Sequence, residues 1–238
     1  MTKEEWWNKY DSKELCKYHT DQFTKWWDPD LFDWRDSWHL AQFCFKYFDV
    51  WWDPDKYDWV NGSWALANKF CSRYFDIWWD AKKFNWEDSW VSAQYCSEYF
   101  NIWWDSEKYN WKEGSWFLAS SCVKYFDIWW DPDKFNWNSS WLLAQYYFKY
   151  FNIWWNPEKY KWKYGTKYLT KYCSEYFNVW WDAEKYDWEN GKDNLSKYCS
   201  SRFTDLQLKQ LLLHQNNLAR EFAIEELNRR KNDKEDLV

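Results

Sequence analysis

Apolar and polar positions along the chain recur in copies of one pattern instead of building one continuous core. In each copy apolar residues stand three, four and seven positions after a cysteine, as Tyr74, Phe75 and Trp78 do after Cys71. These offsets place the side chains on one face of an α-helix. The pattern therefore predicts a helix that leads up to a tryptophan pair in every copy.

The segment 64–79 illustrates the predicted helix. At about 100° per residue, one arc contains Trp64, Ala67, Cys71, Tyr74, Phe75 and Trp78, and Leu66, Phe70 and Ile77 lie beside it. The polar remainder consists of Asn68, Lys69, Ser72 and Asp76. A helix that is apolar over half of its surface packs on two sides and exposes one. We therefore expect Phe70 and Ile77 to lie against neighbouring copies.

A second, shorter helix is predicted after each tryptophan pair. Asp53-Pro54-Asp55 follows Trp52, and an acid before a proline is typical of a helix start. Asn61-Gly62-Ser63 supplies a stop, so this helix reaches only to Trp59. Each copy should hold one helix of roughly 14 residues and one of roughly 6, as the spacing of start and stop signals requires.

The tryptophan pairs fix the repeat. They stand at 26/27, 51/52, 78/79, 103/104, 129/130, 154/155 and 180/181, at intervals of 25, 27, 25, 26, 25 and 26 residues. Copies at a fixed period indicate stacked units whose contacts are with their neighbours. We predict an all-α fold, an α-solenoid of about eight helix-pair repeats with one long and one short helix each, capped by helices at both ends.

The predicted boundaries follow from where the pattern weakens. Residues 1–21 form an N-terminal capping repeat, since Cys16 stands ten positions before Trp26 instead of seven, and 22–203 form the tryptophan-rich solenoid. Residues 204–230 contain two amphipathic stretches broken at 214–217 and lack tryptophan. This segment resembles a single HEAT-type repeat, which implies a helical C-terminal cap. The charged tail 231–238 is expected to fray.

Composition supports a core built of rings. Aromatic residues make up 27% of the 238 residues, with 28 Trp, 19 Tyr and 17 Phe, and each buried ring removes roughly 150–250 Å² from water. Cysteines stand once per copy, with Tyr147 in the equivalent place of one copy. Since an aromatic residue replaces one of them, we interpret the cysteines as small buried apolar residues, with metal or redox use as the alternative.

Charge and hydropathy restrict the partners. The formal net charge is −6, and neither Lys nor Arg collects in a run that would follow a phosphate backbone. No continuous apolar stretch is long enough to span a bilayer, and no secretory leader is visible. We expect a cytoplasmic protein whose partner is neither nucleic acid nor membrane.

Catalytic and metal-binding patterns are weak. Asp-Pro-Asp-Lys-Tyr-Asp runs resemble a calcium loop but lack the Gly and the bidentate Glu of an EF-hand, so we interpret them as helix caps. His19, His39 and His214 lie far apart in the sequence. With no phosphate loop or nucleophile motif either, we predict neither an enzyme nor a cofactor.

Two rows of equivalent residues are the candidate partner-binding positions. On the helix phase above, the second tryptophan of each pair falls at the edge of the polar arc, and it either packs on the short helix that follows or lines a groove. The lysine after each pair forms either a solvated stripe or a partner-facing groove. The candidates are Trp52, Trp79, Trp104, Trp130, Trp155 and Trp181, and Lys56, Lys83, Lys108, Lys134, Lys159 and Lys185.

The architecture leads to a functional hypothesis. A repeat array without catalytic motifs is typical of a non-enzymatic scaffold that binds a protein or peptide partner. One alternative is a glycan or small-ligand module that uses exposed tryptophans. Another is a protein of a bacterial or viral conflict system that inhibits a target enzyme by binding it.

Overall fold

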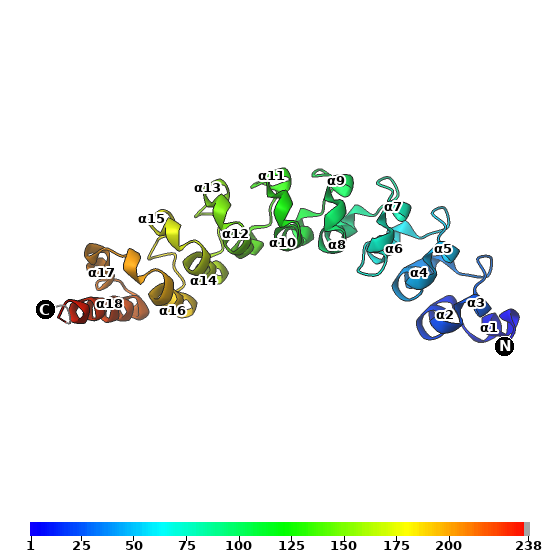
Figure 1. Ribbon diagram of the computed structural model, residues 1–238, viewed down its shortest axis with the longest axis horizontal. Coiled ribbons are helices and arrows are strands. Elements are labelled where there is room, and N and C mark those ends of the chain that lie inside the picture. The colour runs from blue at the N-terminus through cyan, green and yellow to red at the C-terminus, as the bar shows by residue number, and fades with distance from the viewer. Residues whose placement is uncertain (236–238) are drawn as a thin grey trace. The chain divides into compact units, whose positions relative to one another are not determined.

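The structure is a computed structural model that describes residues 1–235, and these residues form helices and turns without a β-strand. It confirms the predicted all-α solenoid of repeated helix pairs. The chain divides into two compact units, Met1–Trp130 and a second unit that begins at Asp131 (Figure 1). Each unit holds successive copies of the pattern, so the packing is described unit by unit.

The first helices of the copies lie in one layer of each unit (Figure 1). Most of them contain a buried Ser or Thr. Neighbouring first helices pack closely, α4 on α6 and α8 on α10 in the first unit, and α14 on both α12 and α16 in the second. The first helices are α4 (Ser37–Phe43), α6 (Trp59–Leu66), α8 (Ser89–Tyr95), α10 (Trp111–Ser121), α12 (Trp141–Tyr146), α14 (Trp162–Tyr172) and α16 (Trp188–Tyr198).

The second helix of each copy is a single turn that ends on the first tryptophan of the pair, and these turns form the other layer of each unit (Figure 1). They are α3 (Phe23–Trp26), α5 (Phe48–Trp51), α7 (Phe75–Trp78), α9 (Phe100–Trp103), α11 (Phe126–Trp129), α13 (Phe151–Trp154) and α15 (Phe177–Trp180). Each follows a 3-10 turn, namely η1 (Thr20–Gln22), η3 (Phe45–Tyr47), η4 (Ser72–Tyr74), η6 (Ser97–Tyr99), η7 (Val123–Tyr125), η9 (Phe148–Tyr150) and η10 (Ser174–Tyr176).

The prediction of one continuous helix over 64–79 is wrong, because α6 ends at Leu66 and α7 begins only at Phe75, with turns and η4 between them. The Cys71 carbonyl accepts the backbone N–H of Tyr74 at 2.9 Å and the indole N–H of Trp78 at 3.0 Å. An α-helix would offer this carbonyl to the residue four positions on. The indole and the 3-10 turn take that acceptor, so α7 starts anew at Phe75.

This break leaves Ile77 out of the expected core, since it is 57% exposed although the continuous-helix phase placed it beside the apolar arc. Phe70 is 40% exposed but stacks on Phe45 of the preceding copy at 4.6 Å between centroids, as expected of a residue that lies against a neighbouring copy. The equivalents of Ile77 are exposed as well, namely Val50, Ile102, Ile128, Ile153 and Val179. The second helices therefore carry an aliphatic residue on their outer side in both units.

The predicted short helix at Asp53 is also wrong, because the segment forms a turn. The Asp53 carboxylate accepts the backbone N–H groups of Asp55 at 3.0 Å and Lys56 at 3.3 Å. Trp59 donates its indole N–H to the Pro54 carbonyl at 2.9 Å and begins α6. The carboxylate thus caps a turn, and the residue expected to end a helix starts one.

Rings fill the space between copies. The buried Phe75 stacks between Trp79 of its own copy, at 5.1 Å between centroids, and Tyr99 of the next copy, at 4.4 Å. Equivalent Phe–Tyr stacks join Phe23 to Tyr47, Phe48 to Tyr74, Phe100 to Tyr125 and Phe151 to Tyr176. Offset or parallel ring pairs add to the energy of area burial, so these stacks hold successive copies together.

Small polar side chains complete the same interfaces. The Ser37 hydroxyl accepts the backbone N–H of Asp58 in the next copy at 2.9 Å, and the Cys71 thiol points at the Ala41 carbonyl of the preceding copy at 3.2 Å. Both contacts recur in later copies, for example from Asn110 to Ser89 and from Cys173 to Ala144. Backbone N–H and carbonyl groups that the irregular turns leave without a partner in their own copy thus form hydrogen bonds across the interface.

The copies are of two kinds, which alternate as far as Tyr160 and are followed by a second Tyr copy at Tyr186. In Phe copies the residue after the turn is Phe32, Phe84 or Phe135, and a 3-10 turn precedes the first helix: η2 (Trp34–Asp36), η5 (Trp86–Asp88) and η8 (Trp137–Ser139). In Tyr copies it is Tyr57, Tyr109, Tyr160 or Tyr186, and the first helix begins directly at the tryptophan. Tyr copies contain one more residue, a glycine, before the first helix's second turn. This difference explains the intervals of 25 and 26 residues, and the interval of 27 contains one further residue between Ala67 and Cys71.

Helices close both ends. At the N-terminus α1 (Lys3–Lys9) and α2 (Ser12–Tyr18) each begin with a capping box. At the other end η11 (Ser200–Arg202) precedes α17 (Asp205–Leu211) and α18 (Asn217–Glu235), and the two helices pack on each other. Residues 231–235, which we expected to fray, continue α18, and 236–238 lie outside the described residues.

Candidate functional site

The second tryptophan of each pair is part of a ring cluster. Trp79 stacks on Phe75 and lies 5.0 Å from Phe84 and 5.9 Å from Trp86, centroid to centroid. Trp52, Trp104, Trp155 and Trp181 have the same surroundings, and these rings and that of Trp130 are all half-buried. The rings thus pack on the turn that follows, which gives them a structural role whether or not they also meet a partner.

The lysine row forms ion pairs between copies. Lys83 lies 2.7 Å from Asp55 of the preceding copy, and Lys159 lies 3.0 Å from Asp133. Lys56 pairs with Asp30 and Lys185 with Glu158 in the same way. Lys56, Lys108 and Lys159 also lie over a tryptophan of the preceding copy, 5.2–5.7 Å from its ring centroid.

Lys108 shows that the pairing of the lysine row depends on an acid in the preceding copy. The preceding copy has Lys82 where other copies have an acid. Lys108 instead pairs with Asp105 of its own copy at 3.2 Å. Lys134 also has interactions within the protein. The row therefore supports the stack, and exposed pairs of this kind contribute little each, roughly 0–1 kcal/mol.

The cysteines are buried and unpaired by disulfides, as predicted. Burial raises the pKa of the thiols of Cys71, Cys122 and Cys199 to about 12, and raises those of Cys96 and Cys173 further. A thiol that stays protonated is a poor nucleophile and a poor metal ligand. The cysteines are therefore packing residues.

The histidines do not meet. His19 packs against Tyr10, the buried His39 stacks on Trp38 at 3.5 Å between centroids, and His214 lies 3.2 Å from Glu184. Burial lowers the pKa of His39. Within residues 1–235 no three His, Cys, Asp or Glu side chains gather as a metal site, and the helices there lack the length and apolar character needed to cross a bilayer.

A ring-lined pocket opens on the first helices of the first unit. It has a volume of about 330 Å³ and is lined by Trp64, Phe70, Trp90 and Tyr95, with Asn68 and Gln94 as polar neighbours. The surface continues through Trp38, 5.6 Å from Trp64 between centroids, and through Trp116, which is 42% exposed. By contrast, the first tryptophan of each pair is at most 1% exposed. The pocket rings are more exposed than the first tryptophans, although Phe70 also stacks on Phe45 of the preceding copy at 4.6 Å between centroids.

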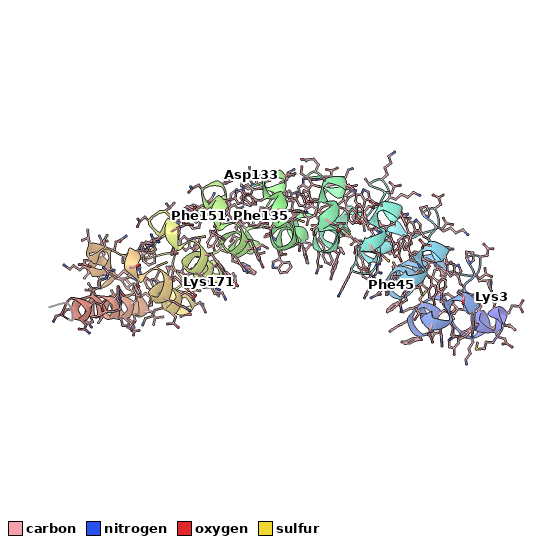
Figure 2. The ribbon with its side chains drawn as sticks, viewed as in Figure 1. Lys3, Phe45, Asp133, Phe135, Phe151 and Lys171 are labelled. Carbon is pink, nitrogen blue, oxygen red and sulfur yellow. The ribbon has the colours of Figure 1, made fainter. Side chains whose placement is uncertain are left out.

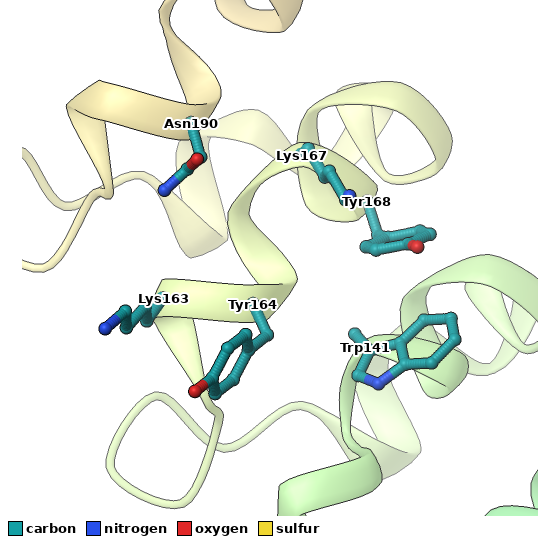
Figure 3. Close-up of a pocket in the computed structure, with 6 residues that line it drawn as sticks. All are labelled: Trp141, Lys163, Tyr164, Lys167, Tyr168 and Asn190. Atoms are coloured by element: carbon teal, nitrogen blue, oxygen red, sulfur yellow. The ribbon is translucent and has the colours of Figure 1, made fainter.

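A larger pocket of about 460 Å³ lies on the first helices of the second unit (Figure 3). Trp141 of α12, Lys163, Tyr164, Lys167 and Tyr168 of α14, and Asn190 of α16 line it. The Tyr168 ring lies 4.8 Å from the Trp141 ring, and the Lys167 ammonium lies 5.2 Å from the Tyr168 centroid. This pocket combines exposed rings with unpaired positive charge.

Sequence reasoning missed both pockets, since none of the candidate residues lines either one, although a signal for the second pocket is present. Residues 163–172 read Lys-Tyr-Gly-Thr-Lys-Tyr-Leu-Thr-Lys-Tyr, so lysines and tyrosines each recur every fourth position. On a helix this spacing gives two adjacent stripes. The candidate positions were instead residues that recur in every copy, such as the tryptophan pairs.

The fold and these pockets define a class, an all-α repeat protein with ring-lined surfaces. Compared with known proteins, the chain matches no family model, no curated protein and no solved structure.

Proposed function

We propose that this protein is a non-enzymatic repeat scaffold that binds a protein or peptide partner through the exposed rings of its first helices. The observation that carries the proposal is the pocket of about 330 Å³ formed by Trp64, Phe70, Trp90 and Tyr95. Large aromatic side chains next to amides are typical of residues that dominate protein interfaces.

The alternative surface is the aliphatic row of the second helices. Ile77 and Ile102 are 57% and 58% exposed, more than Phe70 and Tyr95 at 40% and 38%. Single aliphatic residues on a surface are common and form no pocket. We therefore favour the ring surface, and the isoleucines serve as matched controls for it.

The test is capture of partners on the immobilised protein from lysate of the source organism, with mass spectrometry as the readout. Three proteins are compared: the natural chain, Phe70→Ser with Tyr95→Ser, and Ile77→Ser with Ile102→Ser. We expect one protein at near-equal stoichiometry on the natural chain and the isoleucine variant, and its loss from the ring variant. Thermal melts of all three exclude unfolding as the cause.

Other results would overturn the proposal. Loss from the isoleucine variant alone would place binding on the second helices. Material that is released by free sugar would favour the glycan-binding alternative, and material lost on nuclease treatment would show a nucleic-acid partner. Capture that is unchanged in both variants would show that the partner binds at neither of the two surfaces.

A further inference from the structure

The helix α14 is basic within an acidic protein. It contains Lys163, Lys167 and Lys171 and no acidic residue, while the chain as a whole has a formal charge of −6. The three lysines are exposed and stand four positions apart, so they form one stripe along the helix. Figure 2 labels Lys171 at α14, in the layer of the first helices.

The spacing of these lysines gains little for the helix. Like charges four positions apart repel each other, and positive charge at Lys163 near the helix N-terminus opposes the helix dipole, although Lys171 in the last turn fits it. Lys161 stands at the N-cap of α14 without a capping bond, where α10 has Asn110 and α16 has Asp187 as caps. Residues that break local rules without a structural gain are expected at functional sites.

The stripe also lacks acidic partners. In the part of the chain that the structure describes, no salt bridge involves Lys163, Lys167 or Lys171, whereas Lys159, Lys185 and Lys192 of the same unit are all paired. The hydroxyl of Tyr172 raises the pKa of Lys171, which keeps that ammonium charged. Three positive charges are thus available to a ligand.

Rings lie beside each charge. The ammonium groups of Lys163, Lys167 and Lys171 lie 6.0, 5.2 and 4.8 Å from the centroids of the tyrosines that follow them. Tyr168 stacks near Tyr172 at 6.4 Å and near Trp141 at 4.8 Å. Tyr164 is 62% exposed. The pocket of about 460 Å³ therefore offers apolar ring surface along the charged stripe.

We propose that this face of α14 binds a short acidic segment of a partner protein in an extended conformation. Lysines four positions apart rise about 6 Å along a helix, and alternate residues of an extended chain are roughly 6.6 Å apart. An extended chain that lies between the lysine stripe and the rings can turn carboxylates at alternate positions to Lys163, Lys167 and Lys171. The apolar side chains between them point the opposite way and can contact Tyr164, Tyr168 and Trp141. This inference rests on the proposed scaffold function and names the partner's chemistry at one pocket.

The neighbouring helices favour a protein segment over a nucleic acid. Glu189 and Asp193 of α16 stand at the positions that Lys163 and Lys167 occupy in α14, and Trp141 stands at that of Lys167 in α12. Lys197 of α16 stands at the position of Lys171 and is exposed, so the positive stripe is one helix wide at Lys163 and Lys167 and extends to α16 only at its C-terminal end. A phosphate backbone needs a longer positive track, and one that crossed to α16 would meet two carboxylates.

The experiment measures fluorescence anisotropy of the whole protein with labelled peptides. The probe is Glu-Phe-Glu-Phe-Glu, and its controls are Gln-Phe-Gln-Phe-Gln, Lys-Phe-Lys-Phe-Lys and a twelve-residue oligothymidylate. We expect the acidic probe to bind at least about tenfold more tightly than the Gln and Lys peptides, as desolvated charge pairs require. Its affinity should fall as salt rises.

Charge reversal then locates the site. Lys163→Glu with Lys167→Glu and Lys171→Glu should weaken the acidic probe at least about tenfold and create binding of the Lys peptide. The matched control reverses the exposed Lys82, Lys124 and Lys149, changes the net charge equally and should leave affinity within about twofold. Tyr164→Ser should weaken binding while the melting temperature stays unchanged.

Three results would overturn the inference. They are equal affinity for the Glu and Gln peptides, an α14 reversal without effect on the acidic probe, and oligothymidylate binding that the same reversal removes. The result is separable from the proposed function, because that test uses Phe70 and Tyr95 of the first unit. If a partner is captured but the acidic peptide does not bind, the scaffold function stands and the acidic segment is rejected. If neither the partner nor the peptide binds, the scaffold function is rejected too.

Discussion

The hydroxyl of Tyr109 donates a hydrogen bond to the carbonyl oxygen of Gly114 at 2.9 Å, and its ring occupies the space that a side chain at position 114 would fill. A Cβ at Gly114 would overlap both the hydroxyl and ring carbon Cζ of Tyr109. The same pairing joins Tyr57 to Gly62, Tyr160 to Gly165 and Tyr186 to Gly191. The glycine is therefore required by close approach, since its backbone conformation is ordinary.

Gly114→Ala should lower the free energy of unfolding by about 2 kcal/mol, because a methyl group is forced into a filled space. Urea unfolding followed by circular dichroism measures the change. Tyr109→Phe removes only the hydrogen bond to a buried carbonyl and should cost about 1 kcal/mol. A Gly114→Ala protein as stable as the natural one would show that the Tyr109 ring is free to move aside.

A combined change tests whether the two kinds of copy are interchangeable. Tyr109→Phe with deletion of Gly114 gives the fourth copy, which contains Tyr109, the length and aromatic residue of a Phe copy. We expect this variant to melt at a higher temperature than deletion of Gly114 alone, since Phe copies fold with a 3-10 turn in place of the extra residue. Equal melting temperatures would mean that ring and length are independent.

Trp104→Ala distinguishes a structural tryptophan from a binding one. The ring stacks on Phe100 at 5.0 Å and lies 5.2 Å from Tyr109 and 5.6 Å from Trp111. Its removal should destabilise the protein by about 3 kcal/mol, the lower end for a large core residue because the ring is half-buried. Thermal and urea unfolding provide the measurement, and Trp104→Phe should recover part of the loss.

Unchanged stability with lost capture of a partner would contradict this prediction for Trp104. It would instead make the second tryptophans a binding row.

The architecture could be predicted from the sequence because the cysteine, tyrosine, phenylalanine and tryptophan positions obey helical spacing within each copy. The helix boundaries could not, because they depend on hydrogen bonds between side chains and backbone. The indole of Trp78 takes the Cys71 carbonyl, and that of Trp59 takes the Pro54 carbonyl. The presence of a tryptophan in the sequence does not reveal that its indole N–H will bind a backbone carbonyl seven residues earlier and so prevent a continuous helix.

The positions of the candidate rows could be predicted from the sequence, but the residues of the protein with which they pair could not. Equivalent residues such as Lys83 and Lys159 make equivalent contacts within their own units, but their acidic partners belong to the preceding copy. The α14 pocket depends on an exception to the pattern, since Lys167 replaces the tryptophan found at Trp141. Averaging over copies hides such an exception.

Copy deletions test whether the alternation matters for stability. Removal of 101–126 takes away one Tyr copy and with it α10, the principal neighbour of α8. Removal of 76–126 takes away a Phe copy and a Tyr copy together and preserves their alternation. Both proteins should fold, because contacts in a repeat array are between neighbours.

We expect the shorter deletion to lower the melting temperature more than the longer one. Complete unfolding of both would contradict the solenoid, and a larger loss in the 76–126 deletion would show that copy number outweighs the pairing of copies.

Buried acids predict that the protein loses stability at alkaline pH. The thiols of Cys71, Cys122 and Cys199 have an ordinary pKa of 9.0, which burial raises to about 12. Above pH 9 the unfolded chain releases these protons while the folded protein keeps them, so the free energy of unfolding falls by up to about 1.4 kcal/mol per thiol and pH unit. Below pH 9 both states hold the proton and this dependence vanishes. Urea unfolding between pH 7.5 and 10.5 measures the slope, and Cys122→Ala should reduce it above pH 9 without changing it below. A slope that is the same with and without Cys122 would show that the thiol is open to solvent, and rapid reaction of the native protein with a thiol reagent would establish the same point independently.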